Sequence, residues 1–183
     1  METTLRLLLM LSQKLASARR EVALAEALPL ILAATGSAFG AAYLKQSDAL
    51  VLAAQSGMPA QLRCLVERLS VAAPSSFVAQ RAAESRELTL DRDLQGCEAR
   101  ALAGALSEAG WAQAAACPLT ARGDLHGVLL IAAPVGQEIS CVALTALELG
   151  GNTLALHLAL LARARADIDD AETGRMAPIA AAA

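Results

Sequence analysis

The stretch CPLTARGDLHGVLLIA, residues 117–132, decides the fold. It places two apolar segments on either side of a polar sequence, residues 120–124, that contains Gly123. This pattern predicts two paired antiparallel strands, residues 111–119 and 125–133. Residues 128–131 are apolar at every position, which is typical of a strand that is covered on both faces. The sequence therefore predicts a sheet with a buried central strand.

Cys117 and His126 in the same stretch raise the alternative of a reactive site. A reactive cysteine needs a lowered thiol pKa and an accessible sulfur atom. Strand alternation places His126 on the same side as Val128 and Leu130, which predicts a covered position. We therefore interpret both residues as packing residues and predict no catalytic residue in this stretch.

The segments on the N-terminal side of this hairpin alternate between strands and helices. Residues 41–45 and 50–54 read as a hairpin that ends at Gly57 and Pro59. Further along, apolar spacing and turn residues predict a helix over 59–69, a helix over 76–85, a short strand over 87–90 and a helix over 98–109.

Long helices are predicted at the two ends of the chain, over residues 4–34 and 140–166. The first carries a heptad pattern and could break at Pro29; the second is apolar nearly all round, so it must be covered on more than one side. We expect both helices to form a homodimer interface. The expected interface residues are Leu8, Leu11, Leu15, Val22, Leu147, Leu154, Leu158 and Leu161.

Composition narrows the class of protein. The chain has 183 residues, a net charge of −3 and 56% hydrophobic but only 2% aromatic residues. It has no basic patch of the kind that nucleic-acid binding requires. Polar residues interrupt the apolar run over 140–162, so we predict no membrane span, and Ser12, Gln13 and Lys14 interrupt the only candidate export signal. We expect a cytoplasmic protein with reduced cysteines.

No metal site is predicted. The four cysteines form no CxxC pair, and the chain has only two histidines.

The order of these elements resembles the GAF domain, a sensory fold related to PAS. Cys117-Pro118-Leu119, Gly123 and the run 126–130 are similar to the family's recurrent PL…G…GVL hairpin. Residues 53–59 and 86–91 resemble the end of its second strand and the strand that leads into its ligand-side loop. The resemblance covers roughly residues 10–165.

The resemblance implies an α+β fold: a central antiparallel sheet of five or six strands with helices on both sides. The expected organisation is an N-terminal helix over 1–34, a GAF-like domain over 35–166 and a disordered tail over 167–183. Family members hold ligands between the sheet and the irregular middle segment. At that place the candidate ligand-pocket residues are Tyr43, Arg92, Asp93, Cys97 and Trp111.

The sequence has few of the residues that bind the known cofactors of the family. The chain has one asparagine, Asn152, so the asparagine-containing motif for cyclic nucleotides is missing. Cys97 is followed by Glu98 rather than by the histidine that bilin attachment uses, and haem would have to be ligated by His126 or His157. We predict no cofactor.

Two functions follow from the resemblance. The first is a signalling domain, not an enzyme, that homodimerises, passes its output to a partner protein and takes a small-molecule ligand. The alternative is an enzyme of the free methionine sulfoxide reductase type, with Cys97 as nucleophile and Cys64 or Cys117 as resolving thiol.

Overall fold

The computed structural model describes residues 10–11, 20–71, 77–94 and 100–175. Within them, six strands form one antiparallel sheet in the order β3-β2-β1-β6-β5-β4. The strands are β1 (Phe39–Gln46), β2 (Ala49–Ser56), β3 (Arg68–Ser70), β4 (Thr89–Asp91), β5 (Trp111–Ala121) and β6 (Asp124–Pro134). This confirms the predicted α+β class.

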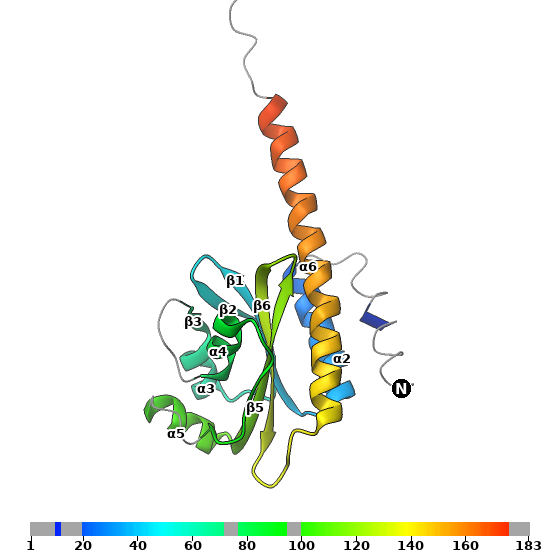
Figure 1. The fold of residues 1–183 in the computed structure, drawn as a ribbon. Helices are drawn as coiled ribbons and strands as arrows, with labels where there is room; N and C mark the ends of the chain where they lie inside the picture. Colours follow the sequence, from blue (N-terminus) through cyan, green and yellow to red (C-terminus); the bar gives the residue numbers. More distant parts are fainter. Residues whose placement is uncertain (1–9, 12–19, 72–76, 95–99, 176–183) are drawn as a thin grey trace, which may run out of the picture.

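Helices cover both faces of the sheet (Figure 1). The helices α2 (Arg20–Thr35) and α6 (Cys141–Arg175) lie side by side on one face. The other face carries α3 (Ala60–Val66), α4 (Val78–Ser85) and α5 (Arg100–Glu108). Successive strand residues point to opposite faces, so the same strands contribute to two separate apolar layers.

We call these layers the terminal-helix layer and the middle-helix layer. Leu28, Leu129 and Leu154 belong to the terminal-helix layer, under α2 and α6. Tyr43, Leu62 and Trp111 belong to the middle-helix layer, between the sheet and α3–α5. The sheet therefore separates the two layers along its whole width.

The second strand of the hairpin, β6, is a central strand of the sheet, as predicted. Leu129 and Leu130 are fully buried on opposite faces of β6. Position 127 on β6 requires glycine, because a Cβ atom there would collide with the backbone carbonyl of Tyr43 on β1. The turn is tighter than expected: it consists of Arg122 and Gly123, both with positive φ (55° and 88°), as a type I′ turn requires.

A β-bulge near this turn changes the expected alternation. The register of β5 and β6 shifts between Leu119 and Thr120, which pair with Gly127 and Leu125. As a result Leu125 shares the middle-helix layer with Val128, although the two are three positions apart. His126 is the extra residue of the bulge, where strict alternation no longer applies, so the side of its ring stays a prediction.

Three element boundaries also differ from the sequence expectations. The helix expected over 59–69 ends at Val66, and Arg68–Ser70 form the edge strand β3 instead. Pro29 does not break α2, which continues to Thr35. The last helix does not end at residue 166 but continues to Arg175, so residues 167–175 are helix rather than tail.

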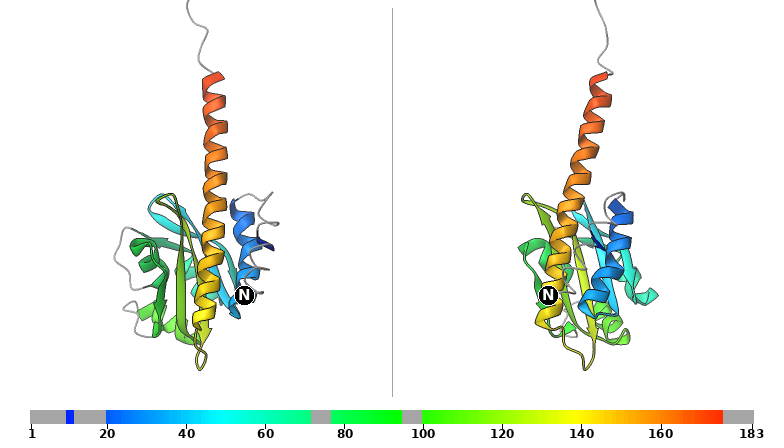
Figure 2. Two further views of the ribbon diagram at one scale, coloured as in Figure 1. Left: turned by 45° about the vertical axis from the view of Figure 1, so that its right-hand side comes forward. Right: turned by 90° about the vertical axis from the view of Figure 1, so that its right-hand side faces the viewer.

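The helix α6 projects well beyond the sheet (Figure 2). Its segment Cys141–Ala166 is long and apolar enough, by length and composition alone, to cross a membrane. Part of this segment is buried against the sheet and α2, which is also the behaviour of a core helix in a globular domain. The absence of a membrane partner stays a prediction.

Candidate functional site

Two of the five candidate pocket residues, Tyr43 and Trp111, lie in the middle-helix layer with almost no exposed surface. The Trp111 ring packs against the Phe39 ring at a centroid distance of 5.5 Å. Within the described part of the chain, neither the Tyr43 hydroxyl nor the Trp111 Nε1 atom has a hydrogen-bond partner. Burial raises the pKa of Tyr43, so its hydroxyl keeps its proton and remains a donor.

Arg92 and Asp93 are not brought to these two donors. Arg92 and Asp93 are exposed in the loop after β4, where the Asp93 backbone N–H donates to the Asp91 carboxylate at 3.2 Å. Cys97 lies outside the described residues. These residues were predicted to form one pocket only because of their order along the chain. The structure places two of them in the core and two on the surface.

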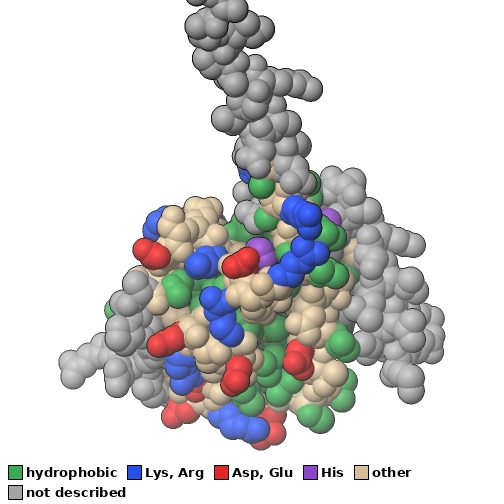
Figure 3. All heavy atoms as spheres, turned by 45° about the horizontal axis from the view of Figure 1, so that its top comes forward, with side chains coloured by type: hydrophobic (Ala, Val, Ile, Leu, Met, Phe, Trp, Pro, Cys, Tyr) green, Lys and Arg blue, Asp and Glu red, His purple; other side chains and the backbone are tan. Residues whose placement is uncertain are grey.

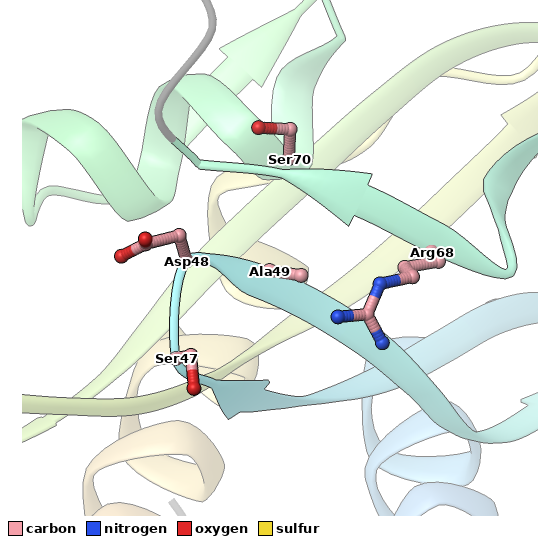
Figure 4. A pocket seen from close by; sticks show the side chains of 5 residues that line it. All are labelled: Ser47, Asp48, Ala49, Arg68 and Ser70. Carbon is pink, nitrogen blue, oxygen red and sulfur yellow. The ribbon is translucent and has the colours of Figure 1, made fainter.

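One surface hollow, of about 410 Å³, lies at the β1–β2 turn and the edge strand β3 (Figure 4). It is lined by Ser47, Asp48, Ala49, Arg68 and Ser70. Asp48 points away from the Arg68 guanidinium, and the four residues other than Ala49 are exposed. It contains none of the candidate pocket residues, and its groups do not converge on one point.

A second cavity, of about 270 Å³, lies on the terminal-helix side of the sheet, between α6 and the outer edge of β5. We call it the α6–β5 cavity. Its lining combines a thiol, a hydroxyl, a carboxamide and charges of both signs. The lining residues are Arg86, Glu87, Leu88, Cys117, Pro118, Thr120, Glu148 and Asn152.

Sequence reasoning missed the α6–β5 cavity because its walls come from three separate segments of the chain. The only local signal was the Gly150-Gly151 pair, which is unfavourable inside a helix unless the backbone must approach a neighbour closely. A Cβ atom on Gly151 would lie 2.6 Å from the Cys117 Sγ atom. The pair thus marks where α6 touches β5.

Cys117 forms part of the floor of this cavity and is only 2% exposed. Burial, and then the nearby Glu148 carboxylate, raise the pKa of its thiol to about 12. A thiol in this state is protonated at neutral pH, whereas nucleophilic chemistry needs the thiolate. Cys117 also pairs with Leu129 across the hairpin and not with His126.

The cysteines of the reductase alternative are not assembled in the described residues. Cys64 is exposed on α3, on the other side of the sheet from Cys117. The proposed nucleophile, Cys97, lies outside the described residues.

Several residues expected at a dimer interface are instead inside the domain. Leu11, Leu147, Leu154 and Leu158 are fully buried in the terminal-helix layer, so they offer no surface to a second copy. Leu8 and Leu15 lie outside the described residues. Val22 is 47% exposed, and Leu161 is partly exposed.

The exposed apolar residues of α6 lie on its opposite side. Val142 is 71% exposed, and Leu156 and Leu160 are each 53% exposed. Together with the partly exposed Leu149, they recur at spacings of seven and four, so they share one face of the helix. We call these four residues the outer stripe of α6.

Comparison with known proteins identifies the architecture. No protein-family model matches the sequence, and no curated protein matches it. Solved structures match over most of the chain. The GAF domain of a phosphoenolpyruvate-protein phosphotransferase from Coxiella burnetii is 19% identical with a TM-score of 0.73, over 91% of this chain and 98% of that one.

A putative GAF sensor protein from Burkholderia vietnamiensis is 20% identical with a TM-score of 0.68, over 90% of this chain and 92% of that one. Free methionine-R-sulfoxide reductase from Neisseria meningitidis is 18% identical with a TM-score of 0.64, over 86% and 89%. At these identities the likeness is one of fold. It confirms the resemblance read from the hairpin of residues 117–132.

Proposed function

We propose that this chain, which has the GAF-domain fold, is a cytoplasmic regulatory domain that homodimerises through α6 and passes a signal to a partner protein along that helix. The observation that carries the proposal is the outer stripe, Val142, Leu149, Leu156 and Leu160. Large apolar side chains in a row on a helix, opposite its buried face, are typical of a protein–protein contact.

The neighbouring helix also exposes an apolar residue. Val22 on α2 is also exposed, and α2 packs beside α6 on the same face of the sheet. A second copy docked on this pair of helices would cover the exposed apolar residues of both. Because the interface would be isologous, each copy would supply the same stripe.

Size-exclusion chromatography with light scattering tests this proposal. We expect the chain to elute with roughly twice its monomer mass of 18.8 kDa, and the double variant Leu156→Glu, Leu160→Glu to elute as a folded monomer. Buried carboxylates at an interface would be desolvated without partners, which opposes association. The matched control is Leu65→Glu, since Leu65 is 44% exposed on α3, away from the stripe.

A dimeric double variant, or a dimer lost equally in the Leu65→Glu control, would overturn the proposed interface. Circular dichroism of each variant separates loss of association from loss of folding.

The middle-helix layer supports a ligand within the proposed function. Tyr43 and Trp111 each hold a buried donor without a hydrogen-bond partner among the described residues, which costs free energy unless a ligand or water satisfies it. Native mass spectrometry of the purified chain, compared with Tyr43→Phe, tests this. A retained molecule that is lost from the variant would support a ligand at this layer.

Two further observations support the remaining parts of the proposal. The cysteines that the structure describes, Cys64, Cys117 and Cys141, are free thiols, the state that cytoplasmic reductants maintain. Charged side chains of both signs are dispersed over the face drawn in Figure 3, with no single-signed patch there for a polyanion.

A further inference from the structure

We propose that two copies of this chain pair antiparallel through the outer stripe of α6, so that the projecting ends of the two α6 helices point in opposite directions. This pairing rests on the homodimer proposed above and adds its direction. An isologous interface alone does not fix the direction, because a two-fold axis can relate parallel as well as antiparallel helices. The charges and the side-chain sizes along α6 favour the antiparallel pair.

The outer stripe has charges of opposite sign at its two ends. Over residues 134–142 the only charged residue is Glu138, which is exposed shortly before α6 begins. Over residues 160–166 the charged residues are Arg163 and Arg165, and both are exposed. Arg163 continues the seven-residue spacing that runs through the stripe, so it lies in line with it, whereas Arg165 is about 200° further round the helix.

Only an antiparallel pair brings these opposite charges together. The stripe spans residues 142–160, so its midpoint is Gly151. A two-fold axis beside Gly151 places Arg163 opposite residue 139 of the second copy, next to the partner's Glu138, and symmetry forms the same ion pair at the other end. In a parallel pair Arg163 would instead lie beside the partner's Arg163, and these like charges would oppose association.

The side-chain sizes along the stripe suit the same direction. The axis beside Gly151 places Leu149 opposite the partner's Thr153 and Leu156 opposite the partner's Ala146. A large side chain thus meets a smaller one, which lets facing side chains interdigitate. In a parallel pair each of these residues would face its own counterpart, so every layer would hold either two large or two small side chains.

Two threonines on this side of α6 do not oppose burial. The Thr153 hydroxyl donates to the Leu149 carbonyl at 2.9 Å, and the Thr145 hydroxyl donates to the Cys141 carbonyl at 3.0 Å. Both hydroxyls therefore already donate within α6. A second copy can cover them without leaving a donor unpaired.

The antiparallel pair determines what the dimer presents to other proteins. The helix α6 projects beyond the sheet and continues to Arg175 (Figure 2). In the antiparallel pair the two projecting ends emerge from opposite ends of the dimer and do not wind around each other. Each end offers its own binding surface, so one dimer connects two partner molecules.

Disulfide cross-linking tests the direction. Other thiols are first removed by Cys64→Ser, Cys97→Ser and Cys141→Ser. The antiparallel axis places residue 142 opposite residue 160 of the second copy, so oxidation with diamide should cross-link the Val142→Cys, Leu160→Cys double variant. Neither single variant should cross-link, because its two introduced thiols lie roughly 27 Å apart along the helix axis. Non-reducing gel electrophoresis measures the fraction of linked dimer.

Charge reversal tests the ion pair. Arg163→Glu should weaken the dimer about five- to tenfold, because it replaces two symmetry-related attractions between exposed charges with two repulsions. Adding Glu138→Arg should restore the affinity to within about twofold. Arg165→Glu is the matched control, since it reverses an exposed charge outside the stripe, and it should leave the affinity unchanged. Sedimentation equilibrium measures the dissociation constant of the dimer.

A linked dimer from either single cysteine variant would overturn the antiparallel pairing and leave the homodimer intact. The same holds if Glu138→Arg does not restore the Arg163→Glu dimer, or if Arg165→Glu weakens the dimer equally. A chain that elutes as a monomer in light scattering would instead overturn the proposed function, and the pairing with it.

Discussion

Gly151 determines how closely α6 approaches the sheet. A Cβ atom on it would lie 2.6 Å from Cys117 Sγ, but 3.6 Å from the nearest carbons of Cys117 and Leu119. The first separation is a collision and the second is an ordinary contact. The sulfur atom alone therefore makes alanine unacceptable at this position.

We predict that Gly151→Ala lowers the free energy of unfolding by about 1–3 kcal/mol, although alanine is the better helix former. In a Cys117→Ala background, where the sulfur is absent, the same change should instead raise it, by up to about 1 kcal/mol. Urea unfolding of the four chains measures this coupling as a double-mutant cycle.

The control for this cycle is Gly104→Ala on α5, where an added Cβ meets nothing within 4 Å. It should stabilise the chain by about 0.5–1 kcal/mol. If Gly151→Ala has the same sign in both backgrounds, the contact with Cys117 is not what selects glycine.

Individual residues also show the limits of prediction from sequence. Gly127 could be recognised in the sequence, because it directly precedes an apolar strand. Its cause is local, the close approach of the Tyr43 backbone. The bulge at His126 could not be predicted, because it depends on the pairing of two strands. Tyr43 and Trp111 share the middle-helix layer, but their separation from the exposed Arg92 and Asp93 is a property of the folded chain.

At the scale of an element, α6 carries two apolar faces, one buried and one exposed. Leu154 is fully buried against the sheet and α2, whereas Leu156, two positions further on, is 53% exposed. The sequence shows that α6 is apolar all round but not which face the domain covers. That choice depends on where β5 and α2 lie, so the expected interface included the wrong side of the helix.

We predict that Leu154→Ala lowers the free energy of unfolding by about 2–5 kcal/mol, because it leaves a cavity in a packed layer. Leu156→Ala should change it by less than about 0.5 kcal/mol. Both are made in a Leu160→Glu background, so that self-association does not contribute, and are compared by urea unfolding. Equal effects of the two substitutions would contradict the assignment of the buried face.

At the scale of the whole molecule, the sheet joins two apolar layers into one unit. Ala42 and Leu44 of β1 face the terminal-helix layer, and Ala41 and Tyr43 face the middle-helix layer. Neither layer can be lost while the other keeps its strands. The α+β class and the order of most elements followed from sequence patterning, but β3 did not, since Leu69 continues the helical spacing of Leu62 and Val66.

This arrangement predicts a single cooperative unfolding transition. Trp111 is the only tryptophan of the chain and lies in the middle-helix layer, so its fluorescence reports on that layer. Leu154→Ala, made in the other layer, should shift the fluorescence midpoint and the far-ultraviolet circular dichroism midpoint equally. A fluorescence midpoint that stays at the wild-type value would show that the layers unfold independently.

The continuity of α6 has a mechanical consequence. The helix is buried as far as Leu158, is exposed over residues 163–166, and runs on without interruption to Arg175. At about 1.5 Å per residue, roughly 25 Å of helix extends past Leu158. A tilt of about 10° about Leu158 would therefore displace Arg175 by roughly 4 Å. A small change in how α6 packs on the sheet would thus be enlarged at the far end of the same helix.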